Sequence, residues 1–229
     1  MSGPVRWAAI GGDQSYVMQG DTLAADQDAS DTLVIRIGDG QPASLPAPLL
    51  PDGGAVLPGL TQDTPADVIS AWVRLWIAGF LARQGPWDGV ICALHGDVSH
   101  WIHISAVEVV SSQSFLSPRL IASLGGIQTA DAQAITDSLS RPERLAAHLR
   151  VGEVSGQPMA ITGHLIGAEL AAARPYWLGQ QVAVIGNSPL ITAYETAIEA
   201  QGCPVSCYDS ADLIPGGLKA LGTALGVVP

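Results

Sequence analysis

The C-terminal part of the chain alternates between strand and helix patterns, and this alternation constrains the fold more than any other feature. Residues 181–185 and 204–208 are apolar runs of strand length, whereas residues 190–201 and 211–225 carry apolar side chains at helical spacing. A strand–helix tail that follows hairpins is typical of a mixed sheet with helices on its faces. The sequence therefore predicts the α/β class.

The N-terminal part has the pattern of hairpins. Three strand-like runs between residues 6 and 25 are separated by turn residues, and a further short strand is predicted at residues 33–37. Residues 38–59 are rich in proline and glycine, which predicts a long irregular crossing pinned against the body. We therefore expect a reduced N-terminal region over residues 1–60 and an α/β body over residues 61–229.

Between these parts, the sequence predicts a helix, two strands and more helices. Thr64 is expected to cap a helix that begins at Pro65 and runs to Ala82. Two apolar strands, at residues 88–94 and 101–110, are then separated by a polar turn. Helical spacing returns at residues 130–139, 143–149 and 159–173.

Charge and cysteine content limit the partners and the chemistry. The chain of 229 residues has 10 Lys and Arg against 21 Asp and Glu, so its net charge is −11 and we expect neither nucleic acid nor an anionic membrane as a partner. Lys219 is the sole lysine, so any lysine-dependent step must use it. The three cysteines lie in apolar segments, which indicates reduced thiols in a cytoplasm, and no metal-ligating set is predicted.

The first candidate site is the polar turn between the two central strands. Gly96 would let a ligand approach the backbone, while Asp97 and Ser99 offer acceptors or a hydroxyl. His100 and His103 are an odd number of residues apart on a strand, so they face opposite sides, which argues against a shared metal. A hairpin turn with solvated histidines and a turn that contacts substrate both stay open.

The second candidate site follows the strand at residues 181–185, where Gly186, Asn187 and Ser188 lead into a helix that begins at proline. Backbone N–H groups and the positive end of the helix dipole would converge there and favour a phosphate or a nucleotide edge. Ordinary helix capping by Asn187 or Ser188 is the alternative.

The third candidate site is the helix at residues 159–173, where Gly163 and Gly167 lie four residues apart. One face of this helix lacks side chains, so a ligand, a second helix or a strand could approach it closely. His164 and Glu169 do not share a face, and we expect no acid/base pair between them.

The same segments resemble the 2-dehydro-3-deoxygalactonokinase family of sugar-acid kinases. Residues 161–177 are similar to the family's Ser-Gly-Leu-Leu-Ile-Gly-Ala-Glu helix, residues 56–60 to its Ile-Pro-Gly-Leu segment, and residues 184–218 to its C-terminal nucleotide-side unit. The resemblance implies a ribonuclease H-like mixed sheet with flanking helices, as in actin and hexokinase. It also implies that the N-terminal half is trimmed.

If the family's activity is kept, the resemblance implies that ATP and magnesium serve to phosphorylate 2-dehydro-3-deoxy-D-galactonate. Asp97 and Asp13 would then be the catalytic carboxylates. The implied partner is a small sugar acid, and a homodimer is left open. The nucleotide and its phosphates would be bound by Gly96, Ser99, His100, Gly163, Gly167, Gly186, Asn187 and Ser188.

Departures from the family pattern predict weak or lost catalysis. The family's Asp-Trp-Gly-Thr-Thr is replaced by residues 10–15, which lack the threonines. In the family's Pro-Gly-Thr-His-Ser-Lys-Trp turn, Asp97 stands for the threonine and His100 for the lysine. Phosphoryl transfer depends on a positioned metal and on cations. The alternative function is therefore a non-catalytic ligand-binding or regulatory relative of the kinase.

Overall fold

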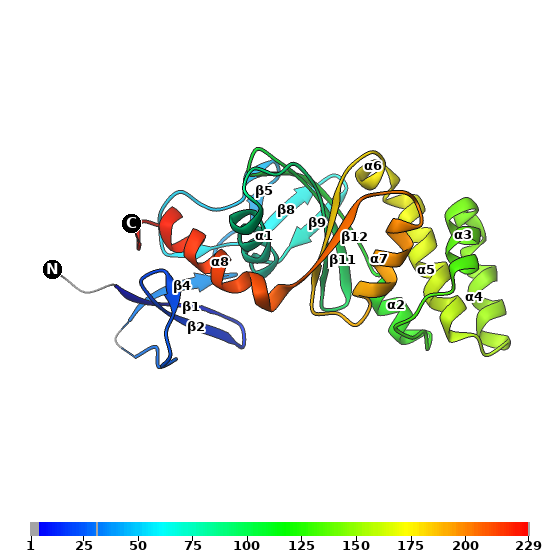
Figure 1. Ribbon diagram of the computed structural model, residues 1–229, viewed down its shortest axis with the longest axis horizontal. Helices are drawn as coiled ribbons and strands as arrows, with labels where there is room; N and C mark the ends of the chain where they lie inside the picture. Colours follow the sequence, from blue (N-terminus) through cyan, green and yellow to red (C-terminus); the bar gives the residue numbers. More distant parts are fainter. Residues whose placement is uncertain (1–4, 31, 229) are drawn as a thin grey trace. The chain divides into compact units, whose positions relative to one another are not determined.

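The computed structural model describes residues 5–30 and 32–228, which form two compact units (Figure 1). Unit 1 contains the chain up to Asp88, the segment Ile104–Ser111 and the residues from Ser210 onward. Unit 2 contains Gly89–His103 and Ser112–Asp209. These units do not coincide with the predicted segments 1–60 and 61–229, because the C-terminal helix groups with the N-terminal sheets.

The larger sheet of unit 1 has the strand order β3-β2-β1-β4-β7. β1 (Arg6–Gly11) pairs antiparallel with β2 (Gln14–Gln19) and parallel with β4 (Leu33–Ile37). The short edge strands are β3 (Thr22–Leu23) and β7 (Val56–Leu57). The predicted N-terminal hairpins and the strand at residues 33–37 are confirmed.

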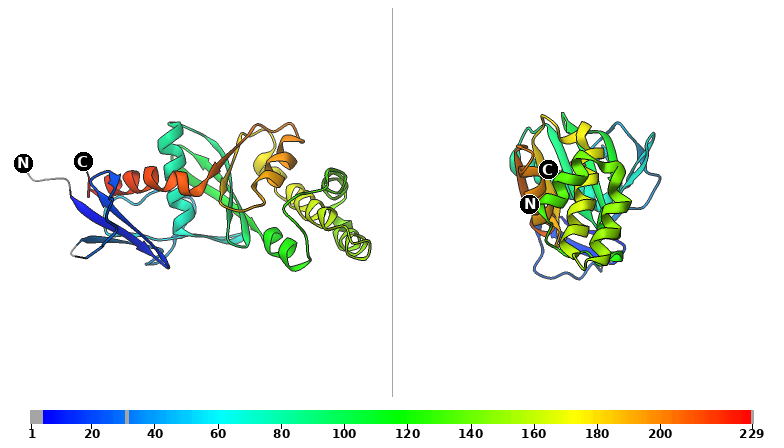
Figure 2. Two further views of the ribbon diagram at one scale, coloured as in Figure 1. Left: turned by 60° about the horizontal axis from the view of Figure 1, so that its bottom comes forward. Right: turned by 90° about the vertical axis from the view of Figure 1, so that its right-hand side faces the viewer.

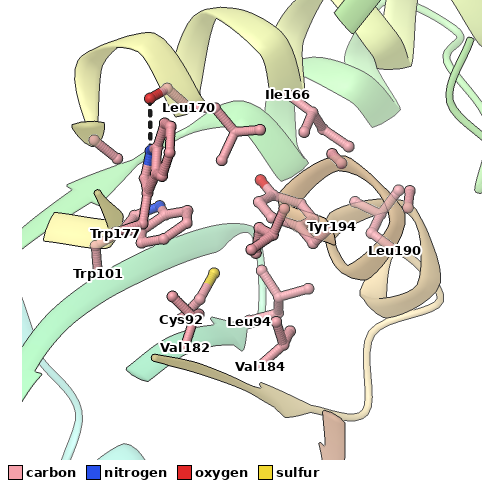
Figure 3. Packing of buried hydrophobic residues seen from close by; sticks show 14 of the residues in the cluster. Cys92, Leu94, Trp101, Ile166, Leu170, Trp177, Val182, Val184, Leu190 and Tyr194 are labelled. Atoms are coloured by element: carbon pink, nitrogen blue, oxygen red, sulfur yellow. Dashed lines mark hydrogen bonds between the residues drawn. The ribbon is translucent and has the colours of Figure 1, made fainter. Parts of the chain in front are cut away.

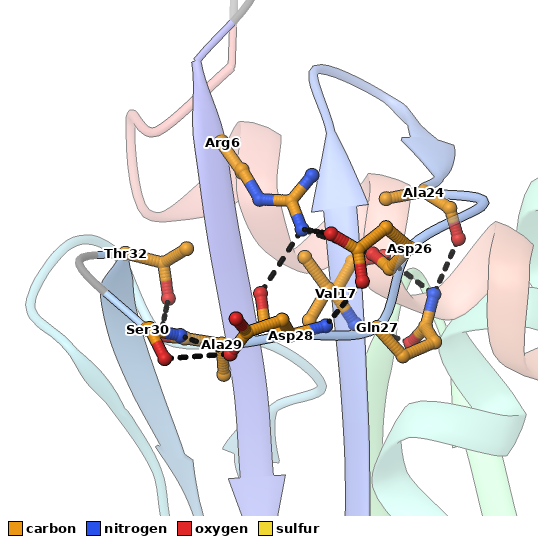
Figure 4. Close-up of polar contacts among 9 residues, drawn as sticks. All are labelled: Arg6, Val17, Ala24, Asp26, Gln27, Asp28, Ala29, Ser30 and Thr32. Carbon is orange, nitrogen blue, oxygen red and sulfur yellow. Dashed lines mark hydrogen bonds and ion pairs between the residues drawn. The ribbon is translucent and has the colours of Figure 1, made fainter.

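Polar contacts fix the loop that follows β3 (Figure 4). The guanidinium of Arg6 donates to the backbone oxygens of Asp26 and Asp28, each at 3.0 Å. The side-chain oxygen of Gln27 accepts from the backbone N–H of Val17 at 2.8 Å. Because the side chains of this loop are mostly exposed, hydrogen bonds rather than apolar burial tie it to β1 and β2.

One buried arginine holds the proline- and glycine-rich crossing. The guanidinium of Arg74 donates to the backbone oxygens of Leu49 at 2.9 Å, Pro58 at 2.6 Å and Pro48 at 3.1 Å. Burial lowers the pKa of Arg74 to about 10, and the three carbonyl dipoles stabilise the cation that burial disfavours. The crossing is thus pinned against unit 1, as the sequence predicts.

Helix α1 (Ala71–Gln84) begins later than the sequence predicts. The residues before it form a hairpin of β8 (Leu60–Asp63) and β9 (Ala66–Ile69), which is joined by β5 (Ala43–Ser44). The predicted start at Pro65 is wrong, because strand pairing takes the residues that the capping pattern assigns to a first helical turn.

Ser70 is the residue that caps α1. Its hydroxyl accepts from the backbone N–H of Trp72 at 3.2 Å, so the predicted cap at Thr64 is wrong. α1 lies against α8 (Ser210–Ala224), and a Cβ at Gly79 would come within 2.0 Å of the backbone oxygen of Leu213. The two helices therefore touch backbone to backbone.

The sheet of unit 2 contains β14-β13-β10-β11-β12 in this order. β10 (Gly89–His95) pairs parallel with β13 (Val182–Gly186), which in turn pairs parallel with β14 (Val205–Asp209). β11 (Val98–Ser105) and β12 (Glu108–Phe115) follow β10 in the chain. The predicted strand–helix–strand–helix tail is confirmed by β13, α7, β14 and α8.

A tight turn divides the region that the sequence predicts as one strand at residues 101–110. Ala106 and Val107 have φ angles of 50° and 65°, in the left-handed region, and they connect β11 to β12. The single-strand prediction is therefore wrong. Neither residue type is typical of this conformation, which explains why the sequence carries no turn signal here.

Helices predicted at residues 130–139, 143–149, 159–173 and 190–201 are confirmed, and α3, α4 and α5 lie side by side (Figure 2). Among the described residues, no helix is both long and apolar enough to cross a membrane. The helical segments of unit 2 are α2 (Ser117–Ser123), α3 (Ala132–Ser140), the 3-10 turn Pro142–Arg144, α4 (Leu145–Val154), α5 (Pro158–Ala172), α6 (Arg174–Trp177) and α7 (Ile191–Glu199).

The apolar core of unit 2 lies between the sheet and helices α5 and α7 (Figure 3). Leu94 of β10, Ile166 of α5 and Tyr194 of α7 are fully buried in it. The indole N–H of Trp177 donates to the backbone oxygen of Leu170 at 2.8 Å, so the last residue of α6 is fixed to the final turn of α5. The turns that follow β10 and β13 extend from this core at the edge of the sheet.

Candidate functional site

A cleft of about 600 Å³ in unit 2 brings two of the three candidate segments together. Gly96 and Asp97 from the turn after β10 line it, and so does Ser188 from the turn after β13. We call it the unit-2 cleft. The rest of its lining is Pro118, Ile121, Ala122, Gly126, Ile127, Gln128, Thr129, Pro189 and Leu190.

The two turns meet because their strands are parallel neighbours. Leu94 of β10 is the register partner of Gly186 of β13, so both strands end at the same edge of the sheet. A Cβ at Gly186 would lie 2.5 Å from the backbone oxygen of Leu94. Gly186 therefore allows the strands to approach, and it is buried rather than part of the cleft lining.

Asp97 is paired with a cation that the sequence analysis missed. The Nε of Arg119 lies 3.5 Å from the carboxylate of Asp97, and the backbone N–H of Arg119 donates to the backbone oxygen of Asp97 at 3.2 Å. Both side chains are more than half exposed. Arg119 lies on α2 and belongs to no motif that marks a functional residue. The one sequence signal for it is its position in the first turn of α2, two residues after Ser117.

Ser99 and His100 point into the protein. The hydroxyl of Ser99 donates to the carboxylate of Glu169 at 2.8 Å, and the Nδ1 of His100 lies 2.6 Å from the hydroxyl of Ser114. Both residues are buried and neither lines the cleft. The turn therefore presents a backbone and a carboxylate, without the positive side chain that the family pattern has at position 100.

The turn after β13 does not cap α7 through Asn187 or Ser188, because the N-cap residue is Leu190 and it makes no side-chain cap bond. The hydroxyl of Ser188 accepts from the backbone N–H of Leu190 at 3.2 Å within the turn, and Ser188 lines the cleft. Asn187 is exposed and is not part of the lining. The site residue supplied by this turn is therefore Ser188.

Gly163 and Gly167 lie on the face of α5 that meets α3. A Cβ at Gly163 would be 2.5 Å from the backbone oxygen of Asp131, and a Cβ at Gly167 would be 2.3 Å from that of Ile135. Both glycines are buried and the structure does not bring them to the cleft. Of the two readings of this face, a packed second helix is the one found.

Asp13 lies in the exposed turn between β1 and β2 of unit 1. Within the described part of the chain, no group of three or more His, Cys, Asp or Glu side chains is arranged to hold a metal ion. Magnesium at nucleotide sites needs only one or two carboxylates in addition to phosphate oxygens. The donors of the unit-2 cleft, which include Asp97, Thr129 and Ser188, fit a magnesium ion that arrives with a nucleotide.

Comparisons with known proteins agree with this architecture. Residues 126–221 match the 2-keto-3-deoxy-galactonokinase family. The curated protein named "Probable 2-dehydro-3-deoxygalactonokinase DgoK1" from Rhizobium meliloti (strain 1021) is 26% identical over 197 residues, which cover 74% of this chain and 64% of that protein. The chain therefore spans less than two thirds of the length of that relative.

A crystal structure from Sinorhizobium meliloti, named for a 2-dehydro-3-deoxygalactonokinase, has the same fold as this chain. The TM-score is 0.77 and the sequences are 19% identical, with 96% of this chain and 99% of that chain covered. The predicted mixed α/β fold with flanking helices is thereby confirmed. The segment from residue 126 to residue 221, which includes α3 to α7, is similar to the 2-keto-3-deoxy-galactonokinase family, and the similarity to the curated relative points to the same family.

Proposed function

We propose that the unit-2 cleft binds ATP with magnesium, and that the chain phosphorylates 2-dehydro-3-deoxy-D-galactonate weakly or not at all. The observation that carries this proposal is the meeting of two strand-end turns, at Gly96–Asp97 and Ser188–Pro189, around one cleft. Ligands of open α/β sheets bind outside the carboxyl ends of the strands. The similarity to the 2-keto-3-deoxy-galactonokinase family suggests the identity of the nucleotide and of the sugar acid.

The charges at the cleft are compatible with a phosphate ligand. A lone carboxylate would repel a triphosphate, but the guanidinium of Arg119 offsets the charge of Asp97. Magnesium bound to the phosphates would neutralise charge on the transferring group, and Asp97 could hold that ion. Arg119 would orient the carboxylate and remain exposed to a phosphate oxygen.

Weak turnover follows from the shortage of further cations. His100 stands where the family has a lysine, and it contacts Ser114 inside the protein. Lys219, the sole lysine, has its ammonium 2.8 Å from the carboxylate of Asp21. Stabilisation of the developing charge would therefore depend on Arg119, magnesium and backbone N–H groups.

A non-catalytic ligand-binding relative is the second candidate function. The inward orientation of Ser99 and His100 favours it, because the polar side chains of the turn stabilise the protein instead of facing a ligand. Such a protein would keep nucleotide or sugar-acid affinity without phosphoryl transfer.

Calorimetric titration with ATP and magnesium tests binding, and a coupled ADP-release assay with 2-dehydro-3-deoxygalactonate tests turnover. We expect measurable binding and a turnover well below about 1 per second, the lower end of the usual kinase range. Arg119→Gln should weaken ATP binding, whereas the control Arg150→Gln, at an exposed pair with Glu153 on α4, should not.

Three results would contradict the proposal. A turnover of about 1 per second or more would show a competent kinase and remove the claim of weak catalysis. Absence of ATP binding in the presence of magnesium would remove the claim that the cleft is a nucleotide site. Equal effects of Arg119→Gln and Arg150→Gln would indicate that binding occurs elsewhere.

A further inference from the structure

The carboxylate of Glu169 is a polar group at the centre of the apolar core of unit 2. Glu169 lies on α5 and is only 3% exposed. Trp101 and Tyr194, both labelled in Figure 3, belong to the surrounding cluster. A buried carboxylate is costly unless hydrogen bonds satisfy it, so its partners decide what it does there.

Donors from several elements converge on this carboxylate. Its Oε1 accepts from the hydroxyl of Ser99 at 2.8 Å and from the indole N–H of Trp101 at 2.8 Å. Its Oε2 accepts from the hydroxyl of Tyr194 at 2.9 Å, and the hydroxyl of Ser117 also bonds to the carboxyl group. Burial raises the pKa of Glu169, while these four hydrogen bonds lower it.

The partners lie on segments that line the unit-2 cleft or that directly follow its lining turns, and these segments are the walls of the cleft. Ser99 follows the turn that contains Gly96 and Asp97. Ser117 begins α2, which contributes Pro118, Ile121 and Ala122 to the lining. Tyr194 lies on α7, directly after the turn from Ser188 to Leu190. The carboxylate thus contacts three walls without lining the cleft itself.

The hydrogen bonds of Glu169 are directional, so they hold the segments around the cleft in defined positions. Apolar contacts alone would allow these segments to shift relative to one another. An apolar side chain could fill the same volume, but it would leave the indole of Trp101 and the hydroxyl of Tyr194 without this acceptor. Binding sites need their walls held to within about half an ångström by such supporting contacts. One carboxylate that serves three walls couples their positions to one another.

We propose that Glu169 is the positioning residue of the unit-2 cleft, and that it sets the relative placement of the turn after β10, of α2 and of α7. The claim that the cleft takes ATP rests on the proposed function, but the claim about its walls does not. A measurement on the protein without ligand can therefore separate the two.

Hydrogen exchange followed by mass spectrometry is the test on the ligand-free protein. Glu169→Ala should accelerate exchange in the segments 96–101, 117–122 and 188–196 more than in the rest of unit 2. Glu169→Gln should restore slow exchange, because its amide oxygen can accept from Ser99 and Trp101 while its NH₂ donates to the hydroxyls of Ser117 and Tyr194. The control Leu170→Ala removes a neighbouring buried side chain and should not single out these segments.

Two milder variants keep the test decisive if Glu169→Ala does not fold. Tyr194→Phe should loosen only residues 188–196, and Ser117→Ala only residues 117–122, since each removes one hydroxyl and leaves the carboxylate in place. Exchange that rises uniformly across unit 2, or Glu169→Gln that behaves like Glu169→Ala, would overturn the proposal.

ATP affinity provides the functional readout. We expect Glu169→Ala to weaken binding of ATP with magnesium by about tenfold or more, and Glu169→Gln to recover most of that loss. If the wild-type protein binds no ATP, the proposed function fails while the exchange data still decide the role of Glu169. Segment-selective exchange with unchanged ATP affinity would overturn the link between the walls and the ligand.

Discussion

At the scale of single residues, the glycines of α5 illustrate what a sequence leaves undecided. The four-residue spacing of Gly163 and Gly167 indicates a close approach on one face, without indicating what approaches. In the structure the answer is the backbone of α3, at Asp131 and Ile135. A ligand and a helix would have produced the same spacing, so only the three-dimensional arrangement separates them.

A single added methyl group tests this contact. Gly167→Ala should lower the free energy of unfolding by about 1–3 kcal/mol, because the new Cβ would lie 2.3 Å from the backbone oxygen of Ile135. Gly216→Ala on α8 is the matched control, since its Cβ would meet nothing closer than 3.5 Å. Urea titrations of both variants measure the effect, and a Gly167→Ala protein as stable as the control would contradict it.

The candidate site was partly predictable for a related reason. Gly96, Asp97 and Ser188 could be identified as candidates because the strands before them read clearly as apolar runs, whereas the parallel pairing that brings the two turns together appears only in the structure. The inward orientation of Ser99 could not be predicted, since it depends on Glu169, seventy residues away in the chain. The role of Arg119 was equally hidden, because this residue lies on α2 and its partner Asp97 lies in the turn after β10.

At the scale of elements, the start of α1 shows how tertiary pairing overrides a local signal. The sequence from Thr64 to Asp67 has the residues of a helix cap, yet it forms the turn and second strand of the β8–β9 hairpin. Val68 is 63% exposed, which an apolar helix face against the core would not allow. The residues of the cap pattern pair with the preceding strand β8, and this pairing decides their conformation instead of the cap.

The contributions of Ser70 and Thr64 to stability can be compared through their alanine variants. Ser70→Ala should cost about 1 kcal/mol of stability, because the N–H of Trp72 loses its acceptor. Thr64→Ala should cost less, since Thr64 caps no helix and is exposed. Thermal unfolding of both variants provides the measurement, and a larger loss for Thr64→Ala would argue for the helix start predicted from the sequence.

A pair of histidines joins three helices of unit 2. The rings of His148 on α4 and His164 on α5 have centroids 4.5 Å apart, and the hydroxyl of Ser138 on α3 lies 3.2 Å and 2.9 Å from their Nδ1 atoms. Burial lowers the pKa of His164, and the neighbouring His148 lowers it further. Asp137 and Asp131 act in the opposite direction and do not reverse the shift.

This pair predicts a loss of stability in mild acid. Below about pH 6.5 the unfolded chain binds a proton that His164 resists in the folded state, so the free energy of unfolding falls as the pH falls. In His164→Gln, the melting temperature should change less between about pH 7 and pH 5. His103→Gln on β11 is the control, and parallel pH profiles for wild type and His164→Gln would contradict the prediction.

At the scale of the whole molecule, the class and the order of the C-terminal elements were predictable, whereas the grouping of elements was not. The alternation of apolar runs indicated the α/β class and the tail from β13 to α8. Nothing in the sequence of α8 states that it lies against α1, because that contact depends on Gly79 and Gly217 meeting backbone atoms far away in the chain. The composition says nothing about this grouping, but it does establish the net charge of −11.

That net charge predicts a dependence of stability on salt. Raising sodium chloride from about 10 mM to about 200 mM shortens the screening distance from about 30 Å to under 10 Å and should raise the melting temperature near neutral pH. Exposed pairs such as Lys219–Asp21 weaken in salt, but they contribute little. Near pH 4.5 many carboxylates are protonated, so the salt effect should shrink, and an increase of equal size at both pH values would contradict this account.

Arg74 has a consequence for how this chain can change over evolutionary time. Its guanidinium donates to three backbone oxygens of the crossing, at Pro48, Leu49 and Pro58. Substitutions within the crossing leave those acceptors in place, so most of them should be tolerated as long as the path of the backbone is kept. The conformation of the irregular crossing therefore depends largely on one residue of a regular helix, Arg74 on α1. The sequence of the crossing can therefore vary, whereas Arg74 itself should not tolerate substitution.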